Sequence, residues 1–105
     1  MEKILVVDDE QSLREVLSIM LKRAGYAVTS VSDGEEAIEQ VQKEIFDLVI
    51  TDLRMDPMNG LELMRHIRQG DPDLPIIMLT AYASAETAAE AKRLNCFAYL
   101  TKPFS

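Results

Sequence analysis

The stretch Asp47-Leu-Val-Ile-Thr-Asp-Leu-Arg-Met-Asp-Pro-Met-Asn-Gly60 begins with a short apolar run that ends in an acid. The run is Leu48-Val49-Ile50, the acid is Asp52, and a loop with Pro57 and Gly60 follows. A carboxylate at the C-terminal end of a buried strand lies where open α/β sheets bind their ligands. The stretch therefore predicts a parallel α/β sheet with Asp52 at its ligand-binding edge.

A second apolar run, Lys3 to Val7, is followed directly by Asp8 and Asp9. Its unbroken apolar character indicates a strand that is buried on both faces, as in a parallel sheet. If the two strands are neighbours, three carboxylates meet at one edge, where they repel one another unless a cation joins them. An oxygen-only site of this kind suits Mg²⁺. We expect Asp52 to accept a phosphoryl group, assisted by that metal.

Length and composition indicate a single soluble domain. The chain has 105 residues, 48% of them hydrophobic, and a net charge of −7. This charge disfavours direct binding to nucleic acids and to anionic membranes. Cys96 is the single cysteine, so no internal disulfide can form and a reduced cytoplasmic setting is expected. No signal peptide is expected before the first strand, and the longest apolar run is too short to span a bilayer.

The apolar pattern predicts four strand–helix repeats and a final strand. The expected strands are Lys3–Val7, Tyr26–Val31, Asp47–Thr51, Pro75–Leu79 and Phe97–Leu100. The expected helix caps are Ser12, Asp33, Asn59 and Ser84, and the first three have a capping-box glutamate, namely Glu15, Glu36 and Glu62. Short loops between these elements indicate a parallel sheet with right-handed crossovers. The fourth helix is alanine-rich, so we expect it to be the least firmly seated.

Two more polar residues follow strand ends: Thr80 after the fourth strand and Lys102 after the fifth. A carboxylate can act as a covalent nucleophile, an ammonium can neutralise phosphoryl oxygens, and a hydroxyl can donate a hydrogen bond to them. Each residue alone has a structural explanation, because Asp8 and Asp9 could cap the next helix and Asp52 could cap a turn. The five together favour a phosphoryl-transfer site.

Five segments resemble the receiver domain of bacterial two-component response regulators, and together they span essentially the whole chain. They are Ile4-Leu-Val-Val-Asp-Asp-Glu10, Asp47-Leu-Val-Ile-Thr-Asp-Leu-Arg-Met55, Met58-Asn-Gly-Leu-Glu-Leu63, Ile77-Met-Leu-Thr-Ala81 and Ala98-Tyr-Leu-Thr-Lys-Pro-Phe104. Their spacing also resembles the receivers of σ54-dependent, NtrC-type transcription activators. The resemblance implies a flavodoxin-like, doubly wound sheet of five parallel strands in the order 2-1-3-4-5.

The same resemblance assigns a role to each site residue. Asp52 would take a phosphoryl group from a histidine of a sensor kinase. Asp9, Asp52 and the backbone carbonyl of Arg54 would hold Mg²⁺ directly, while Asp8 would act through a water. Lys102 would pair with the carboxylate and then with the phosphoryl group, and Thr80 would move to hydrogen-bond it. Tyr99 would swing inward as the switch aromatic, although an aromatic there could also serve only for packing. The Lys102–Pro103 bond would be cis.

The chain departs from the family pattern at three places. Asp56-Pro57 replaces the usual Pro-Gly, which should change the path of the loop, and Asp56 could be a solvated loop residue or an extra metal ligand. Asn95-Cys96 replaces Gly-Ala, and Asn95 should preserve the turn because asparagine tolerates left-handed geometry. No fifth helix follows Phe104, so residues 1–105 correspond to a receiver truncated before that helix. The first helix should then stand alone on its face, which favours a homodimer or a domain-swapped oligomer.

Several other functions compete with a signalling switch that only assists its own phosphorylation and dephosphorylation. An aspartate-nucleophile phosphatase needs a second acid two residues after the nucleophile, where this chain has Arg54. A cofactor-binding flavodoxin-like domain needs a phosphate cradle after the first strand, which is absent from the sequence. An engineered or degenerate scaffold that self-associates without normal signalling remains the alternative. His66, between two arginines, is expected to be a solvated surface residue.

Overall fold

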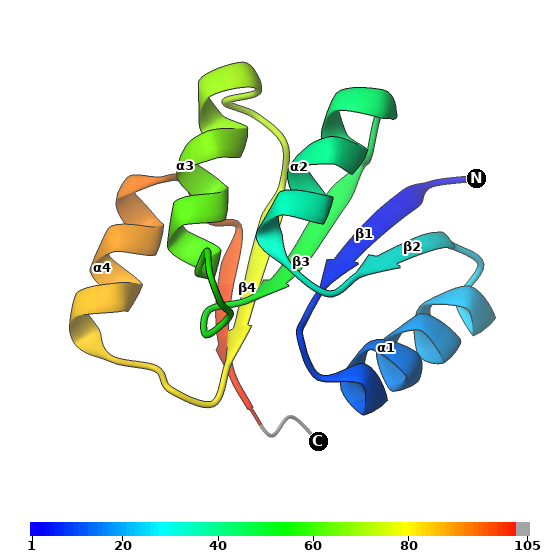
Figure 1. The fold of residues 1–105 in the computed structure, drawn as a ribbon, viewed down its shortest axis with the longest axis horizontal. Coiled ribbons are helices and arrows are strands. Elements are labelled where there is room, and N and C mark those ends of the chain that lie inside the picture. Colours follow the sequence, from blue (N-terminus) through cyan, green and yellow to red (C-terminus); the bar gives the residue numbers. More distant parts are fainter. Residues whose placement is uncertain (103–105) are drawn as a thin grey trace.

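The computed structural model describes residues 1–102, and in these residues five strands alternate with four helices (Figure 1). The elements are β1 (Lys3–Val7), α1 (Gln11–Arg23), β2 (Ala27–Val31), α2 (Gly34–Lys43), β3 (Leu48–Asp52), α3 (Gly60–Gly70), β4 (Ile76–Thr80), α4 (Ala85–Arg93) and β5 (Ala98–Thr101). The predicted Lys102–Pro103 cis bond and Phe104 lie outside the described residues. None of the described helices is long and apolar enough to cross a membrane.

All neighbouring strands are parallel, and their order is β2-β1-β3-β4-β5. This confirms the predicted fold class. The central strands β1 and β3 pair with Val6 opposite Ile50 and Val7 opposite Thr51. As a result, the residues that follow Val7 and Thr51 reach the same edge of the sheet.

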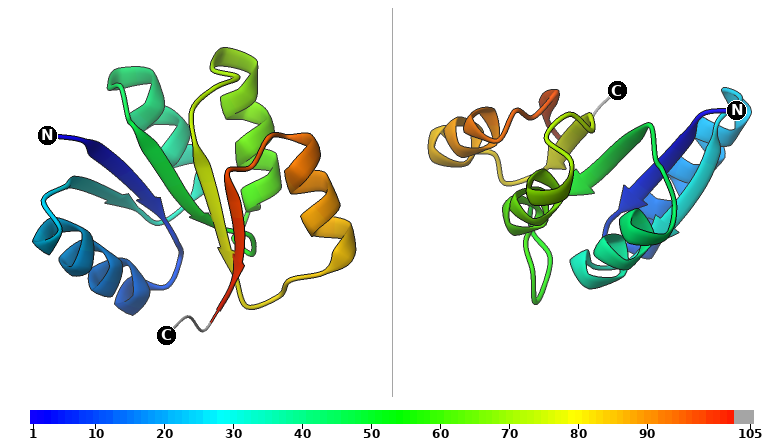
Figure 2. Two further views of the ribbon diagram at one scale, coloured as in Figure 1. Left: turned by 180° about the vertical axis from the view of Figure 1, so that it is seen from behind. Right: turned by 90° about the horizontal axis from the view of Figure 1, so that it is seen from above.

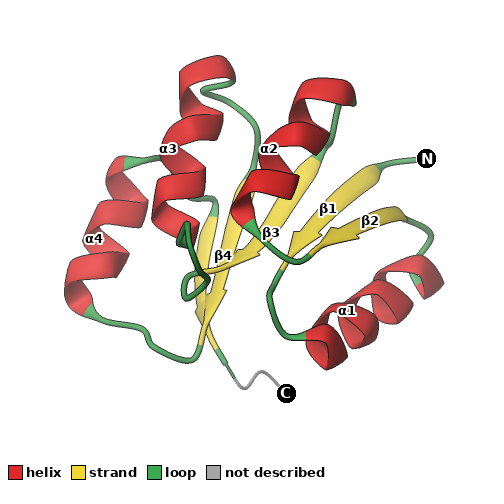
Figure 3. Cartoon of the chain, in the orientation of Figure 1, coloured by secondary structure: helices red, strands yellow, loops and turns green. Residues whose placement is uncertain are grey.

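Helices cover both faces of the sheet, as Figures 2 and 3 show. The larger core lies under α2, α3 and α4, and its fully buried members include Leu5, Val49, Leu63, Met64 and Met78. The smaller core lies under α1 and contains Ile4, Val6, Leu17, Ile50 and Leu79. Alternate residues of β1 therefore face opposite cores, which explains why its sequence is apolar throughout.

Within the described residues, α1 is the only helix over the smaller core. Its outward side carries Val16, Ile19 and Met20, each about half exposed at 49%, 52% and 55%. Leu100 of β5 is 47% exposed as well. The domain thus presents several large apolar side chains to solvent on the elements α1 and β5.

Three of the four predicted helix caps are confirmed. The side chains of Asp33 and Ser84 accept hydrogen bonds from the backbone three residues ahead, and Asn59 forms a complete capping box with Glu62. The box predicted for Asp33 is incomplete, because the Glu36 carboxylate accepts from the Ser32 hydroxyl instead. The prediction for Ser12 is wrong, because α1 begins at Gln11 with Glu10 at the N-cap and no side-chain cap. Asp8 explains the shift, since its carboxylate accepts the Glu10 N–H at 2.9 Å and so shapes the turn before the helix.

The helix ends follow the expected turn chemistry. Gly25 follows α1 with φ of 100°, a conformation that glycine adopts without a steric penalty. Asn95 follows α4 with φ of 60°, so the Asn95-Cys96 turn has the left-handed geometry that was predicted for it. Four strands begin one residue later than predicted, at Ala27, Leu48, Ile76 and Ala98 rather than at Tyr26, Asp47, Pro75 and Phe97.

Candidate metal and phosphoryl-acceptor site

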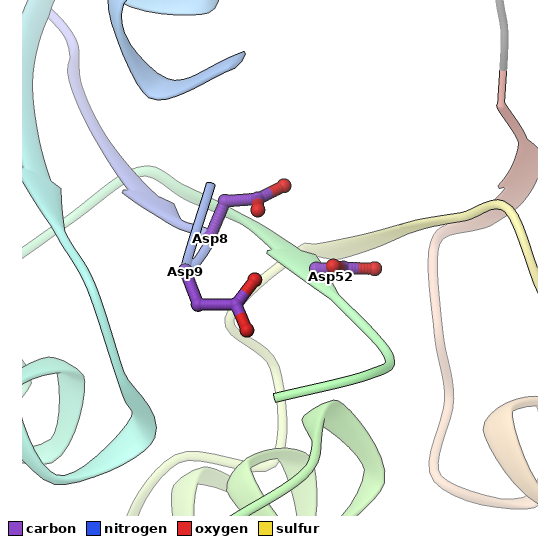
Figure 4. A group of neighbouring side chains, drawn as sticks. All are labelled: Asp8, Asp9 and Asp52. Carbon is purple, nitrogen blue, oxygen red and sulfur yellow. The ribbon is translucent and has the colours of Figure 1, made fainter. Parts of the chain in front are cut away.

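Three carboxylates meet at the carboxyl edge of the sheet, where Figure 4 shows them side by side. Asp8 and Asp9 follow β1, and Asp52 is the last residue of β3. One oxygen from each lies within 4.8 Å of the others. Asp8 and Asp52 are buried, with exposed fractions of 3% and 8%, whereas Asp9 is exposed. The structure therefore brings together the three acids that the sequence predicted as neighbours.

The surroundings of Asp52 disfavour its negative charge. Burial, and after it repulsion from the Asp8 carboxylate, raise the pKa of Asp52 above its usual range. The Lys102 ammonium and the backbone N–H groups of Leu53 and Arg54 oppose this shift without cancelling it. Acids held this close fit a hard divalent cation, because it offers positive charge to oxygen ligands. The carboxylate oxygens of Asp8, Asp9 and Asp52 are therefore suitable ligands for Mg²⁺.

Lys102 reaches the same group of acids from the end of β5. Its Nζ donates a hydrogen bond to Asp8 Oδ2 at 3.0 Å and lies 3.5 Å from Asp52 Oδ2. Burial opposes the charged ammonium, but the hydrogen bond and attraction from Asp8, and then the charge of Asp52, raise the pKa of Lys102. The lysine is therefore a permanent cation at neutral pH, placed between the two buried acids.

Thr80 ends β4, the strand next to β3, and it is fully buried. Its side-chain oxygen accepts the backbone N–H of Tyr82 at 2.9 Å, and its carbonyl accepts the backbone N–H of Lys102 at 2.8 Å. Accepting a hydrogen bond does not use the hydroxyl hydrogen, which remains a donor. Thr80 thus ties the ends of β4 and β5 together beside the acids.

Gly60 allows α3 to start against the acceptor residue, a role that the sequence analysis did not foresee. A Cβ at this position would lie 2.2 Å from the backbone oxygen of Asp52 and 2.9 Å from the sulfur of Met78. The Gly60 N–H also donates to the carbonyl of Leu53 at 2.8 Å. The available signal was a glycine directly after the Asn59 N-cap, at the start of the helix that follows the acceptor loop.

A protein-family model, described as the response regulator receiver domain, matches residues 4–105. The chain belongs to this family. Receiver domains are signalling switches that bind Mg²⁺ in an acidic pocket and interact with histidine kinases, and they are not enzymes in the usual sense. The membership confirms the resemblance drawn from the sequence motifs and disfavours the alternative of a degenerate scaffold.

Named relatives of this receiver domain support a finer assignment. The transcriptional regulatory protein ZraR of Escherichia coli is 42% identical over 100 residues, covering 95% of this chain and 23% of ZraR. The response regulator protein PilR of Pseudomonas aeruginosa is 42% identical over 102 residues, covering 97% of this chain and 23% of PilR. Both are NtrC-type σ54 activators, as the spacing of the motifs predicted. The chain spans only about a quarter of their length.

A solved structure gives the same fold. The response regulator protein TrrA of Thermotoga maritima, in complex with Mg²⁺–BeF, matches with a TM-score of 0.90 at 37% identity. The match covers 100% of this chain and 90% of that chain. The backbone of the receiver domain is therefore close to that of a relative whose structure contains Mg²⁺ and BeF.

The loop after β3 carries two exposed residues, Arg54, for which the family resemblance implied a metal contact through its carbonyl, and Asp56, for which the sequence left a metal contact open. Asp56 is exposed and, among the described residues, lies outside the group of three acids. This supports the prediction that it is a solvated loop residue. The Asp56–Pro57 bond is cis. The Arg54 guanidinium stacks 4.3 Å from the centre of the Tyr82 ring, a contact between the β3 and β4 loops that the sequence analysis missed.

The predicted switch residue, Tyr99, lies on β5 with its ring packed against the larger core. Its hydroxyl is 2.6 Å from Thr87 Oγ1, on the first turn of α4. The Tyr99 ring therefore contacts the larger core, while its hydroxyl contacts α4. His66, by contrast, is exposed on α3, as predicted.

Proposed function

We propose that this receiver domain is a phosphorylation-dependent switch in which Asp52 accepts a phosphoryl group from a histidine of a sensor kinase. The observation that carries the proposal is the convergence of Asp8, Asp9, Asp52 and Lys102 at one edge of the sheet. Membership of the receiver family supports the reaction class, and the acidic cluster supports the metal.

In the proposed reaction, a carboxylate oxygen of Asp52 forms a bond to phosphorus while the bond between phosphorus and the histidine nitrogen breaks. The nitrogen keeps the electron pair of that bond. Asp9, Asp52 and the backbone carbonyl of Arg54 would hold Mg²⁺, and Asp8 would act through a water. When bound, the metal supplies positive charge for the phosphoryl oxygens. Lys102 supplies a second positive charge, because its Nζ lies 3.0 Å from Asp8 Oδ2 and 3.5 Å from Asp52 Oδ2.

The conformational response would pass through Thr80 and Tyr99. The hydroxyl of Thr80 would turn to donate to a phosphoryl oxygen, giving up the hydrogen bond that it accepts from the backbone of Tyr82. Movement of the β4–α4 loop would then change the space available to Tyr99. The domain would then have two states, one with the present contacts of Thr80 and Tyr99 and one without them, and the phosphoryl group would shift their populations. A cytoplasmic location and control of transcription by a longer protein follow from the same proposal.

Intact mass spectrometry after incubation with a small acyl phosphate and Mg²⁺ tests the proposal. One phosphoryl adduct is expected, which Asp52→Asn and removal of divalent metal abolish. Asp73→Asn is the matched control, because Asp73 is an exposed acid far along the chain from the site and should leave the adduct unchanged. No adduct under any metal condition would instead favour a scaffold without phosphoryl transfer.

We also propose that the domain self-associates through its α1 side. The half-exposed side chains of Val16, Ile19 and Met20 support this, because large apolar groups gathered on one helix favour a protein contact. Light scattering over a concentration series tests it. A rise in mass that Ile19→Gln suppresses is expected, whereas a monomer at every concentration would exclude it.

A further inference from the structure

The helix α4 is attached to the rest of the domain by different means at its two ends. At the C-terminal end, the Arg68 guanidinium of α3 donates to the carbonyls of Leu94 at 2.7 Å and Asn95 at 3.0 Å. The same guanidinium donates to the carbonyl of Leu74 at 2.7 Å. Ala91, near this end, is the only fully buried residue within α4. Charged hydrogen bonds and burial therefore hold the C-terminal end.

The N-terminal end is held by a ring of hydroxyl groups. Ser84, the N-cap, accepts the backbone N–H of Thr87 on its side-chain oxygen at 3.1 Å. Thr87 Oγ1 lies 2.6 Å from the phenolic oxygen of Tyr99, and the backbone N–H of Ser84 donates to that oxygen at 3.4 Å. Ala85 and Glu86, between these two residues, are exposed. Hydrogen bonds, rather than apolar contacts, therefore fix this end of the helix.

Comparison with α3 shows what Tyr99 replaces. In α3, the N-cap Asn59 accepts the N–H of Glu62, and the Glu62 carboxylate accepts the N–H of Asn59 in return. This reciprocal pair is a capping box. In α4, the corresponding third position is Thr87, whose side chain is too short to accept the N–H of its N-cap. The phenolic oxygen of Tyr99 accepts that N–H instead.

The hydroxyl hydrogens fit this arrangement. The phenol of Tyr99 accepts from the Ser84 N–H and can donate its own hydrogen to Thr87 Oγ1. Thr87 can then donate to the Ser84 carbonyl, which lies 3.3 Å away. The Ser84 hydroxyl lies 2.9 Å from Thr87 Oγ1 and can donate to that oxygen as well. Each donor in the ring therefore has an acceptor, and Thr87 joins the phenol of Tyr99 to the N-cap.

We propose that Tyr99 completes the capping box of α4 from β5, with Thr87 as the positioning residue, so that displacement of Tyr99 uncaps the first turn. The C-terminal end stays anchored by Arg68, which makes the N-terminal end the part of α4 that responds. This inference rests on the proposed switch role of Tyr99 for its signalling consequence, but the capping itself is a property of the unphosphorylated protein.

Amide hydrogen exchange of the unphosphorylated domain tests the proposal. Tyr99→Phe removes the phenolic oxygen, and exchange at Ser84 and in the first turn should accelerate about fivefold, which corresponds to about 1 kcal/mol for one hydrogen bond. Thr87→Val should have a similar effect, and the double variant should add little more. Thr87→Ser, which keeps the hydroxyl, should restore protection. The first turn of α3 is the internal control and should not change.

A designed variant gives the sharpest outcome. Thr87→Glu supplies α4 with the box partner that α3 already has in Glu62, so its first turn should be protected even when Tyr99→Phe is added. The proposal fails if Tyr99→Phe leaves amide exchange in the first turn of α4 unchanged, or if it accelerates exchange equally at Lys92–Leu94. It also fails if Tyr99→Phe accelerates exchange in the first turn when Thr87→Glu is present. Loss of the phosphoryl adduct on Asp52 would leave this measurement unaffected, so the two proposals fail separately.

Discussion

Lys102 donates a hydrogen bond of 3.0 Å to the buried carboxylate of Asp8, which lies 94 residues earlier in the chain. The contact joins the ends of β5 and β1, although β3 and β4 separate these two strands in the sheet. Among residues 1–102, Lys102 is the cation that forms salt bridges with the carboxylates of Asp8 and Asp52, and its removal would leave both without one.

Lys102→Met should lower the free energy of unfolding by about 3 kcal/mol without divalent metal, because it leaves buried carboxylates unpaired. Millimolar Mg²⁺ should recover part of the loss. Lys3→Met is the matched control, because Lys3 pairs with Glu44 where both side chains are exposed, and it should cost less than about 1 kcal/mol. Urea denaturation of the three proteins measures both values. Equal losses in the two variants would contradict a special role for Lys102.

Asp52→Asn should raise the free energy of unfolding by about 1 kcal/mol at neutral pH without metal. The pKa of Asp52 is raised, so the folded state binds its proton more tightly than the unfolded state, and the ionised group costs stability above the folded pKa. The gain from Asp52→Asn should disappear as the pH falls below the ordinary value of 3.8, where the carboxyl is protonated in both states. Thermal melts of both proteins from pH 3 to pH 8 measure this gain in stability. A gain that does not change with pH would contradict the explanation by the raised pKa of Asp52.

Gly60→Ala should destabilise the domain by about 2–3 kcal/mol, because the new Cβ would overlap the backbone oxygen of Asp52. It should also slow formation of the phosphoryl adduct, since the acceptor residue must shift. Gly70→Ala, at the other end of the same helix, has open space around its Cβ and should be neutral or slightly stabilising. Denaturation midpoints for both variants check the prediction, which a neutral Gly60→Ala would refute.

Cys96 should react slowly with iodoacetamide at pH 8. Burial raises the pKa of its thiol, whose single hydrogen can be donated to the carbonyl of Ala98 at 3.0 Å or of Ile76 at 3.3 Å. Because only the thiolate attacks, the rate should continue to increase with pH beyond the range where an exposed cysteine levels off. The same reaction in denaturant is the control. A rate at pH 8 equal to that of the denatured chain would show that the thiol is accessible and unshifted.

The buried strands and their acids were predictable from local patterns, whereas the strand order came from the resemblance to the receiver family. Apolar runs that end in Asp8 and Asp52 identify two buried strands, and parallel pairing then places both acids at one edge. The helix starts at Asn59 and Ser84 followed from side chains that cap the backbone within three residues. These local patterns therefore predicted the caps of α3 and α4 correctly, although the Ser12 cap was wrong.

Contacts between distant residues could not be predicted in the same way. One local contact was missed too, because the start of α1 follows the turn that Asp8 forms with Glu10, and the Ser12–Glu15 pattern gives no sign of that turn. The close approach of Gly60 to Asp52 and the stacking of Arg54 on Tyr82 depend on how two loops meet in space. Such contacts require the tertiary structure, since nothing in either loop alone specifies its partner.

The site depends on residues from position 8 to position 102, because Lys102 completes a cluster that Asp8 begins. If the proposed function holds, a nascent chain on the ribosome would not be phosphorylated by its kinase until β5 has been synthesised and has joined the sheet. Phosphorylation of Asp52 would then report that the domain is finished as well as that a signal has arrived.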